Sequence, residues 1–286
     1  MKTAILAVFL AAILALLARP LQERLRFVFR RAPGLLWAVP VLLAAVFAGA
    51  STVVDAFSVP LTLVVLVYAA AAVACVWFLP PSLDLVAVLF LWLPIEFAAG
   101  AALVPRPAQG FLHSVAYGIA ILLGLIIFLG YRHLEGMKYN PPRRLADVRL
   151  PLIAFALTAP VLILVGIPIG FIPPPHLPVQ SAGKMAAALG IIFAGTALPE
   201  EILFRDLIQN LLVKRFGDTE RTLIVASVIF GAAHLDNGPQ PVPNWRYMIL
   251  ATIAGYAYGK VFRKSSTVLS SATLHTLVDW TKHFFF

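Results

Sequence analysis

Long apolar runs, separated by short polar segments, extend over almost the whole chain. Ten runs can be delimited by charged residues, proline and glycine, and a membrane-spanning helix needs about 20 predominantly apolar residues. The eighth and ninth runs are short, so nine spans are an alternative count. The pattern predicts an all-α fold, a polytopic transmembrane helical bundle of about nine or ten spans. The runs cover approximately 3–18, 34–54, 60–79, 83–103, 111–130, 150–171, 185–213, 222–235, 245–260 and 267–286.

The composition favours a membrane protein and excludes several other classes. Hydrophobic residues make up 61% of the 286 residues and charged residues 12%, whereas soluble domains carry about 25% charged residues. We therefore exclude a soluble enzyme, a disordered protein and a nucleic-acid-binding module, although the net charge is +9. The single cysteine, Cys75, excludes disulfides within the chain and a cysteine-built metal site.

Basic residues are distributed unevenly between the two sides of the predicted bundle. If the N-terminus lies outside, the inside connections at 19–31, 132–149, 214–221 and 260–264 contain sixteen of the 22 lysines and arginines. Inside loops of membrane proteins are enriched in these residues, so we expect the N-terminus outside, in a plasma or inner membrane. The residues that follow the first run form a poor cleavage site for signal peptidase. We therefore expect the first run to be a retained span rather than a signal peptide.

The most polar connection, from Tyr131 to Arg149, marks an organisational boundary. Its centre contains Pro141 and Pro142, and two consecutive prolines cannot continue a helix. We place the boundary near residue 148. Residues 1–148 are predicted to form N-terminal transmembrane helices of unknown role, and residues 149–286 a second domain that holds most polar residues found within the runs.

Three of these runs carry ionisable groups to a similar depth. The residues concerned are Glu200 and Glu201 in one run, His234 in the next, and His275 and Asp279 in the last. Counted at 1.5 Å per helical residue from the nearest inside charge, they lie about 16–22 Å deep. An ionisable group at such a depth costs a few kcal/mol, so we interpret this layer as a functional site.

Helical spacing suggests which of these side chains interact. Glu201 and Arg205 are four residues apart, as are His275 and Asp279, so each pair lies on one helix face. Glu200 points about 100° away from Glu201 and has no obvious partner on its own helix. It could act as a general base. Asp279 could orient the ring of His275.

The three motifs resemble those of the CPBP family, the CAAX proteases and bacteriocin-processing enzymes, also called the Abi family. They are Glu200-Glu201-Ile-Leu-Phe-Arg205, Phe230-Gly-Ala-Ala-His234 and His275-Thr-Leu-Val-Asp279. The resemblance covers about residues 150–286 and identifies 149–286 as a CPBP-like intramembrane peptidase domain. It implies that Glu200 and His234 activate the attacking water, and that His275 and Asp279 stabilise the oxyanion.

Supporting roles are expected for three further motif residues. Glu201 and Arg205 form either a structural ion pair or part of the catalytic apparatus, and Phe230 packs beneath the site. Many family members have Asn where this chain has Asp279. Asn can donate a hydrogen bond to an oxyanion, whereas an ionised Asp would repel it, so Asp279 is either protonated or holds His275, and we favour the second role.

The motifs leave metal dependence open. Glu200, His234 and His275 could hold zinc with an open position for water, but no His-Glu-x-x-His motif is present. We favour a glutamate-activated water and no cofactor, with zinc as the alternative.

The function expected from this sequence is hydrolysis of a peptide bond in a membrane-anchored, lipid-modified or sorted protein. The partners are then a membrane-embedded protein or peptide substrate and the lipid bilayer, without nucleic acid. Two alternatives from other classes are a proton-coupled carrier, which could use the same polar layer as an ion relay, and a non-proteolytic scaffold or immunity protein. No inverted repeat of the kind common in carriers is apparent in the sequence.

Overall fold

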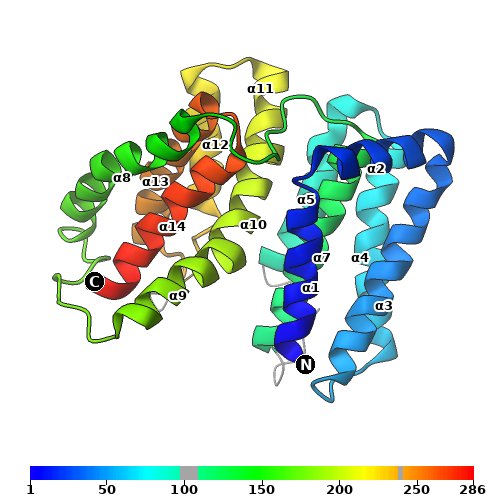
Figure 1. The fold of residues 1–286 in the computed structure, drawn as a ribbon, viewed down its shortest axis with the longest axis horizontal. Helices are drawn as coiled ribbons and strands as arrows, with labels where there is room; N and C mark the ends of the chain where they lie inside the picture. Colours follow the sequence, from blue (N-terminus) through cyan, green and yellow to red (C-terminus); the bar gives the residue numbers. More distant parts are fainter. Residues whose placement is uncertain (97–108, 238–240) are drawn as a thin grey trace. The chain divides into compact units, whose positions relative to one another are not determined.

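The computed structural model describes residues 1–96, 109–237 and 241–286, and every regular element within them is a helix (Figure 1). This confirms the predicted all-α class. The chain forms two units, Met1–Met137 and Lys138–Phe286. The second unit thus begins within the polar connection Tyr131–Arg149, about ten residues before the boundary expected near residue 148.

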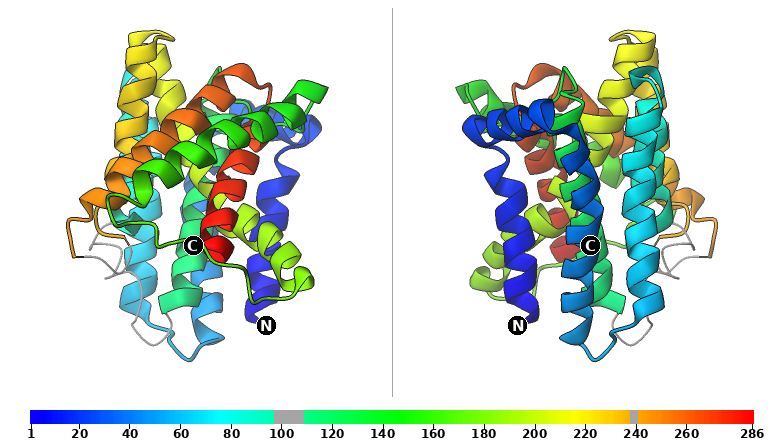
Figure 2. Two further views of the ribbon diagram at one scale, coloured as in Figure 1. Left: turned by 90° about the vertical axis from the view of Figure 1, so that its left-hand side faces the viewer. Right: turned by 90° about the vertical axis from the view of Figure 1, so that its right-hand side faces the viewer.

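The first unit contains a polar helix that the apolar pattern did not predict. Helix α2 is bent by 86° from α1, and Figure 2 shows it lying across the end of α1. Its sequence is rich in arginine, and Pro20 occupies its first turn, where a missing N–H is tolerated. The α-helices of this unit are α1 (Lys2–Ala15), α2 (Arg19–Arg31), α3 (Ala38–Thr52), α4 (Val59–Phe78), α5 (Asp84–Glu96) and α7 (Gln109–Leu125); η1 (Pro33–Trp37) and η2 (Pro81–Leu83) are 3-10 turns, and η4 (Ile126–Tyr131) is a π-helical turn.

The second unit is built around one long, irregular helix, from Ala182 to Phe216. Several of its helices begin at a Ser, Thr or Asn whose side chain accepts a hydrogen bond from a backbone N–H of the first turn. Helices α13 and α14 pack against each other and against α8 (Figure 1). The elements are α8 (Leu145–Gly166), α9 (Ala182–Ile192), η5 (Phe193–Ala197), α10 (Leu198–Glu201), η6 (Ile202–Gln209), α11 (Asn210–Phe216), α12 (Glu220–Ala232), α13 (Trp245–Lys264) and α14 (Val268–Phe285).

Among the described residues, five helices are long and apolar enough to cross a membrane, and the count is six if the bent pair α1 and α2 forms one span. All ten predicted apolar runs coincide with helices where the structure describes them. The last part of the run 83–103, from residue 97 onward, lies outside the described residues. The last three runs form α12, α13 and α14. Helix α12 has only 13 residues, which is too short for a span. Helices α13 and α14 are long enough but less apolar, so none of the three is among the candidate membrane spans. The protein is a multi-pass membrane protein.

The polar connection after residue 137 is fixed to the turn between α13 and α14. The Nζ of Lys138 donates to the carbonyl oxygens of Phe262 at 2.6 Å and Ser265 at 2.9 Å. A cation that bonds the last carbonyls of a helix is favourably placed at the negative end of the helix dipole. Asp147 accepts a hydrogen bond from the backbone N–H of Ser266 at 2.8 Å.

A second contact joins the turn before α12 to the same end of α13. Arg263 pairs with Asp218 at 2.8 Å. The basic residues at 138–149, 214–221 and 260–264 therefore lie at one end of this unit.

Candidate active site

The adjacent carboxylates Glu200 and Glu201 lie on a single α-helical turn between two π-helical segments. Helix α10 has four residues, with η5 before it and η6 after it. Pro199, its second residue, has no N–H to donate to the preceding turn. Local changes from α to π pitch occur frequently at functional sites. The two glutamates therefore lie where the pitch of the helix changes.

Glu201 and Arg205 form the ion pair that their spacing predicts. The Nε of Arg205 donates to Glu201 Oε2 at 3.0 Å, and both side chains are completely buried. The other oxygen of Glu201, Oε1, lies 3.2 Å from Nδ1 of His275. A buried carboxylate needs such partners, because burying an unpaired charge is very costly. Glu201 thus connects η6 to α14 and fixes the orientation of the His275 ring.

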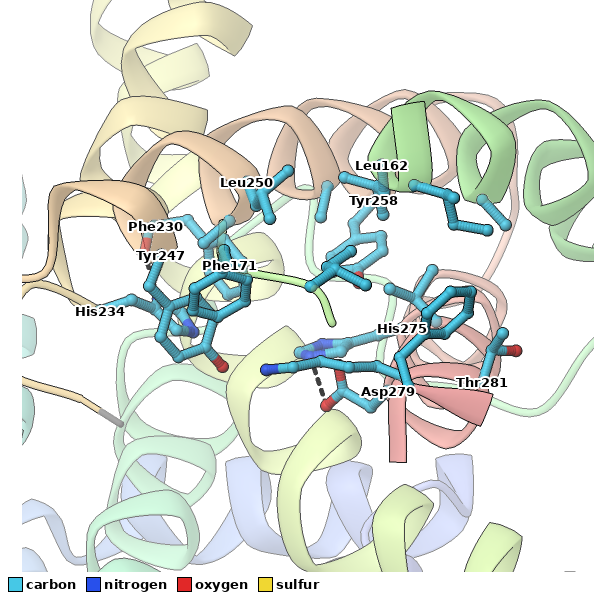
Figure 3. Close-up of a pocket in the computed structure, with 18 of the residues that line it drawn as sticks. Leu162, Phe171, Phe230, His234, Tyr247, Leu250, Tyr258, His275, Asp279 and Thr281 are labelled. Carbon is cyan, nitrogen blue, oxygen red and sulfur yellow. Dashed lines mark hydrogen bonds and ion pairs between the residues drawn. The ribbon is translucent and has the colours of Figure 1, made fainter. Parts of the chain in front are cut away.

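His275 lies between three carboxylates. Its Nε2 is 3.4 Å from Asp279 Oδ2 and 3.9 Å from Glu200 Oε2, and the contact with Asp279 is drawn in Figure 3. The predicted pairing of His275 with Asp279 is therefore present. A neutral imidazole can donate from only one nitrogen, whereas both nitrogens of His275 face acceptors. This arrangement stabilises the doubly protonated, cationic ring. It also gives Glu200 a neighbour on α14, which the sequence did not provide on its own helix.

His234, which follows the end of α12, is held in one tautomer by a carbonyl group of that helix. Its Nδ1 lies 2.8 Å from the carbonyl oxygen of Phe230, and a carbonyl can only accept, so Nδ1 carries the proton. In the neutral ring the lone pair is then on Nε2. The ring also packs against Tyr247, with centroids 4.5 Å apart. His234 is buried and lines the same cavity as Glu200.

Aromatic side chains form the apolar base of the site. Phe230 packs edge-to-face against Phe204 at 4.9 Å and His275 at 5.8 Å, and the guanidinium of Arg205 lies 4.9 Å from its ring centroid. This agrees with a packing role for Phe230. Tyr258 stacks on His275 with centroids 4.5 Å apart. The sequence analysis missed Tyr258, because an aromatic residue within an apolar run carries no spacing signal.

Replacement of Gly255 by alanine is expected to disturb this base. A Cβ at Gly255 would lie 2.8 Å from Cδ1 of Phe230, whereas a Cβ at Gly190 would meet nothing within 4 Å. Overpacking of a buried contact costs about 1–3 kcal/mol. We expect Gly255→Ala to lower the thermal unfolding temperature in detergent and Gly190→Ala to leave it unchanged or raise it slightly. Equal unfolding temperatures for the two variants would contradict the close packing of α13 on Phe230.

The four predicted catalytic residues all line one cavity of about 90 Å³. About 10–15 Å³ of such space holds one water, so the cavity has room for several waters or part of a substrate. Figure 3 shows the side chains that point into it from α8, α12, α13 and α14. Its lining includes Lys282, to which the sequence analysis assigned no role at the site. The signal was present, since Lys282 follows His275 by seven residues and Asp279 by three.

The same geometry bears on the predicted zinc alternative. Within residues 1–96, 109–237 and 241–286, no three His, Cys, Asp or Glu side chains are grouped as they would be around a metal ion. In addition, Nδ1 of His234 and both ring nitrogens of His275 already face protein oxygens. The residues Glu200, His234 and His275 therefore do not form a ready zinc ligand set in this arrangement.

Comparison with known protein families gives one match. Residues 182–281 match the family described as type II CAAX prenyl endopeptidase Rce1-like, and the matched segment contains all three motifs of the cavity. No curated protein and no solved structure matches the chain. The family match agrees with the resemblance found in the sequence. Over residues 182–281 the chain is therefore similar to the Rce1-like family of type II CAAX prenyl endopeptidases.

Proposed function

We propose that the protein hydrolyses a peptide bond with a water activated by Glu200. The observation that carries this proposal is the convergence of Glu200, His234, His275 and Asp279 on one cavity large enough for water. Of the two adjacent glutamates, Glu200 has a side chain that is 20% exposed, whereas that of Glu201 is fully buried. Glu200 is therefore the one that can reach a water.

In the proposed reaction, Glu200 accepts a proton from the water as its oxygen attacks the scissile carbonyl. The unprotonated Nε2 of His234 helps to hold and polarise this water. The cationic ring of His275 stabilises the oxyanion that forms, because positive charge and donors are placed where negative charge develops. Asp279 keeps His275 oriented rather than contacting the oxyanion itself. The proton taken by Glu200 then passes to the leaving amine.

The proposed substrate is a protein held in the membrane by an anchor or a lipid modification. Much of the cavity wall is apolar, with Leu162 and Ile163 from α8 and Leu250 and Ala254 from α13. Such a wall accommodates an acyl, prenyl or apolar peptide segment better than a soluble, charged one. We place the protein in a plasma or inner membrane with its N-terminus outside, because its basic connections then lie inside.

The test is an in-cell comparison of the wild type with Glu200→Ala, at matched membrane insertion and accumulation. Fragments of co-expressed membrane proteins that are present with the wild type and absent with Glu200→Ala are the expected result, and they would also identify the substrates. Glu220→Ala, which changes a glutamate 46% exposed on the surface, is the matched control and should retain all fragments. Identical fragments for the wild type and Glu200→Ala would overturn the proposal. The proton-coupled carrier and the non-proteolytic scaffold would then be the remaining functions. Purified protein assayed with and without a chelator would test the zinc alternative.

A further inference from the structure

Lys282 lies in the same cavity as the proposed catalytic residues, yet no step of the proposed hydrolysis uses it. It lies on the face of α14 that also carries His275 and Asp279, because spacings of three, four and seven residues bring side chains to one side of a helix. All three side chains line the cavity. A lysine at this place requires an explanation, since a partly buried ammonium costs free energy unless it is paired.

Two aromatic rings lie against the ammonium of Lys282, and the carboxylate of Asp279 attracts it from the same helix without reaching ion-pair distance. The Nζ of Lys282 lies 4.4 Å from the ring centroid of Phe171 and 4.7 Å from that of Tyr247. Within the part of the chain that the structure describes, Lys282 forms no ion pair. Ring faces attract a cation but accept its three N–H donors poorly. The ammonium is thus held in position with capacity left to bind an anion.

We propose that Lys282 is a specificity-determining residue that binds a carboxylate of the substrate close to the scissile bond. This inference rests on the proposed function. Lys282 lies one helical turn beyond Asp279, about 4.5 Å along the helix axis, and an extended peptide covers about 3.3–3.6 Å per residue. The carboxylate is therefore within a few residues of the bond that is cleaved. It belongs either to a free C-terminus or to an acidic side chain.

The test measures binding, so that it does not depend on turnover. The protein carries Glu200→Gln and is purified in detergent. The probes are three fluorescent, farnesylated peptides of one sequence: one with a free C-terminal carboxylate, one with a C-terminal carboxamide, and one carboxamide with aspartate as its last residue. We expect the free acid to bind about tenfold to a hundredfold more tightly than the carboxamide, as for a hydrogen bond to a charged group. Recovery of affinity by the aspartate peptide would indicate that any nearby carboxylate suffices.

Further variants separate this role from a structural one. Lys282→Met should reduce the ratio of the two dissociation constants to about one, while Lys282→Arg should keep it. Lys184→Met, which removes an exposed lysine of α9, should also keep it. Unfolding temperatures of all variants show whether Lys282→Met is folded; if it is not, Lys282→Gln, which also lacks the positive charge, takes its place and should likewise reduce the ratio to about one.

Three outcomes would overturn the inference: no binding of any peptide, equal affinity for acid and carboxamide, or an unchanged ratio in Lys282→Met. None of these would affect the proposed hydrolysis, which the fragments lost in Glu200→Ala test separately. Conversely, a Lys282-dependent ratio without any Glu200-dependent fragment would support the carboxylate site and overturn the hydrolysis.

Discussion

Glu200→Gln is expected to lower the cleavage rate by about 10²–10⁴-fold, the range attributed to general acid–base catalysis, while leaving the protein folded. The amide is nearly isosteric with the carboxylate but cannot accept the proton of the attacking water. The side chain of Glu200 is partly exposed to the cavity, so the fold depends little on its charge. The measurement is kcat of purified protein on a substrate identified in cells, together with its unfolding temperature.

The neighbouring Glu201 provides the matched control for this result. Glu201→Gln makes the same chemical change one residue away, but there the carboxylate is fully buried between Arg205 and His275. We expect Glu201→Gln to lower the unfolding temperature markedly, with loss of activity following loss of folded protein. If Glu200→Gln retained wild-type kcat, or if Glu200→Gln unfolded and Glu201→Gln did not, the assignment of the two glutamates would be wrong.

The largest effect on stability is expected from Arg205→Ala. This change leaves Glu201 as a buried carboxylate without its guanidinium partner, and breaking a buried ion pair in this way costs about 3–5 kcal/mol. It also removes the cation from the face of Phe230, 4.9 Å from its ring centroid. The result should be a large drop in unfolding temperature and poor accumulation in membranes.

A double variant and a surface control make this prediction specific. Arg221→Ala removes an arginine that is exposed at the start of α12 and should change stability by less than about 0.5 kcal/mol. In Glu201→Gln/Arg205→Ala the buried carboxylate that lost its guanidinium partner is also removed, so the double variant should be more stable than Arg205→Ala alone. Additive losses in the double variant would show that the two side chains do not interact and would contradict the structure.

Local spacing was enough to predict the parts of the site that lie within one helix. The contacts of Glu201 with Arg205 and of His275 with Asp279 are both between residues four apart, and both are present. The family resemblance rests on the same local motifs, and the matched residues 182–281 contain them. The apolar runs likewise predicted where helices occur, because burial in lipid or protein requires little more than a continuous apolar stretch.

Contacts between helices could not be obtained in this way. Nothing in the spacing indicates that Glu201 reaches His275, 74 residues later, or that Tyr258 stacks on that ring. The π-helical segments around α10 also leave no mark in the hydrophobic pattern. The polar helix α2 was missed for a different reason. Its arginines were assigned to a loop because they follow the apolar run, whereas they lie in a helix that begins after a sharp bend.

The shortness of α12 has a consequence for the surrounding lipid. Its 13 residues are about 20 Å long, while the hydrocarbon core of a bilayer is about 30 Å thick. The exposed Ile224, Val225 and Val228 form an apolar outer face that lipid chains must cover. Hydrophobic mismatch of this kind is relieved by local thinning of the bilayer, at a fraction of a kcal/mol per Å. Thinning at this face brings headgroups and water nearer to His234, which follows the end of α12, so bilayer thickness is expected to influence both where the protein accumulates and how fast it works.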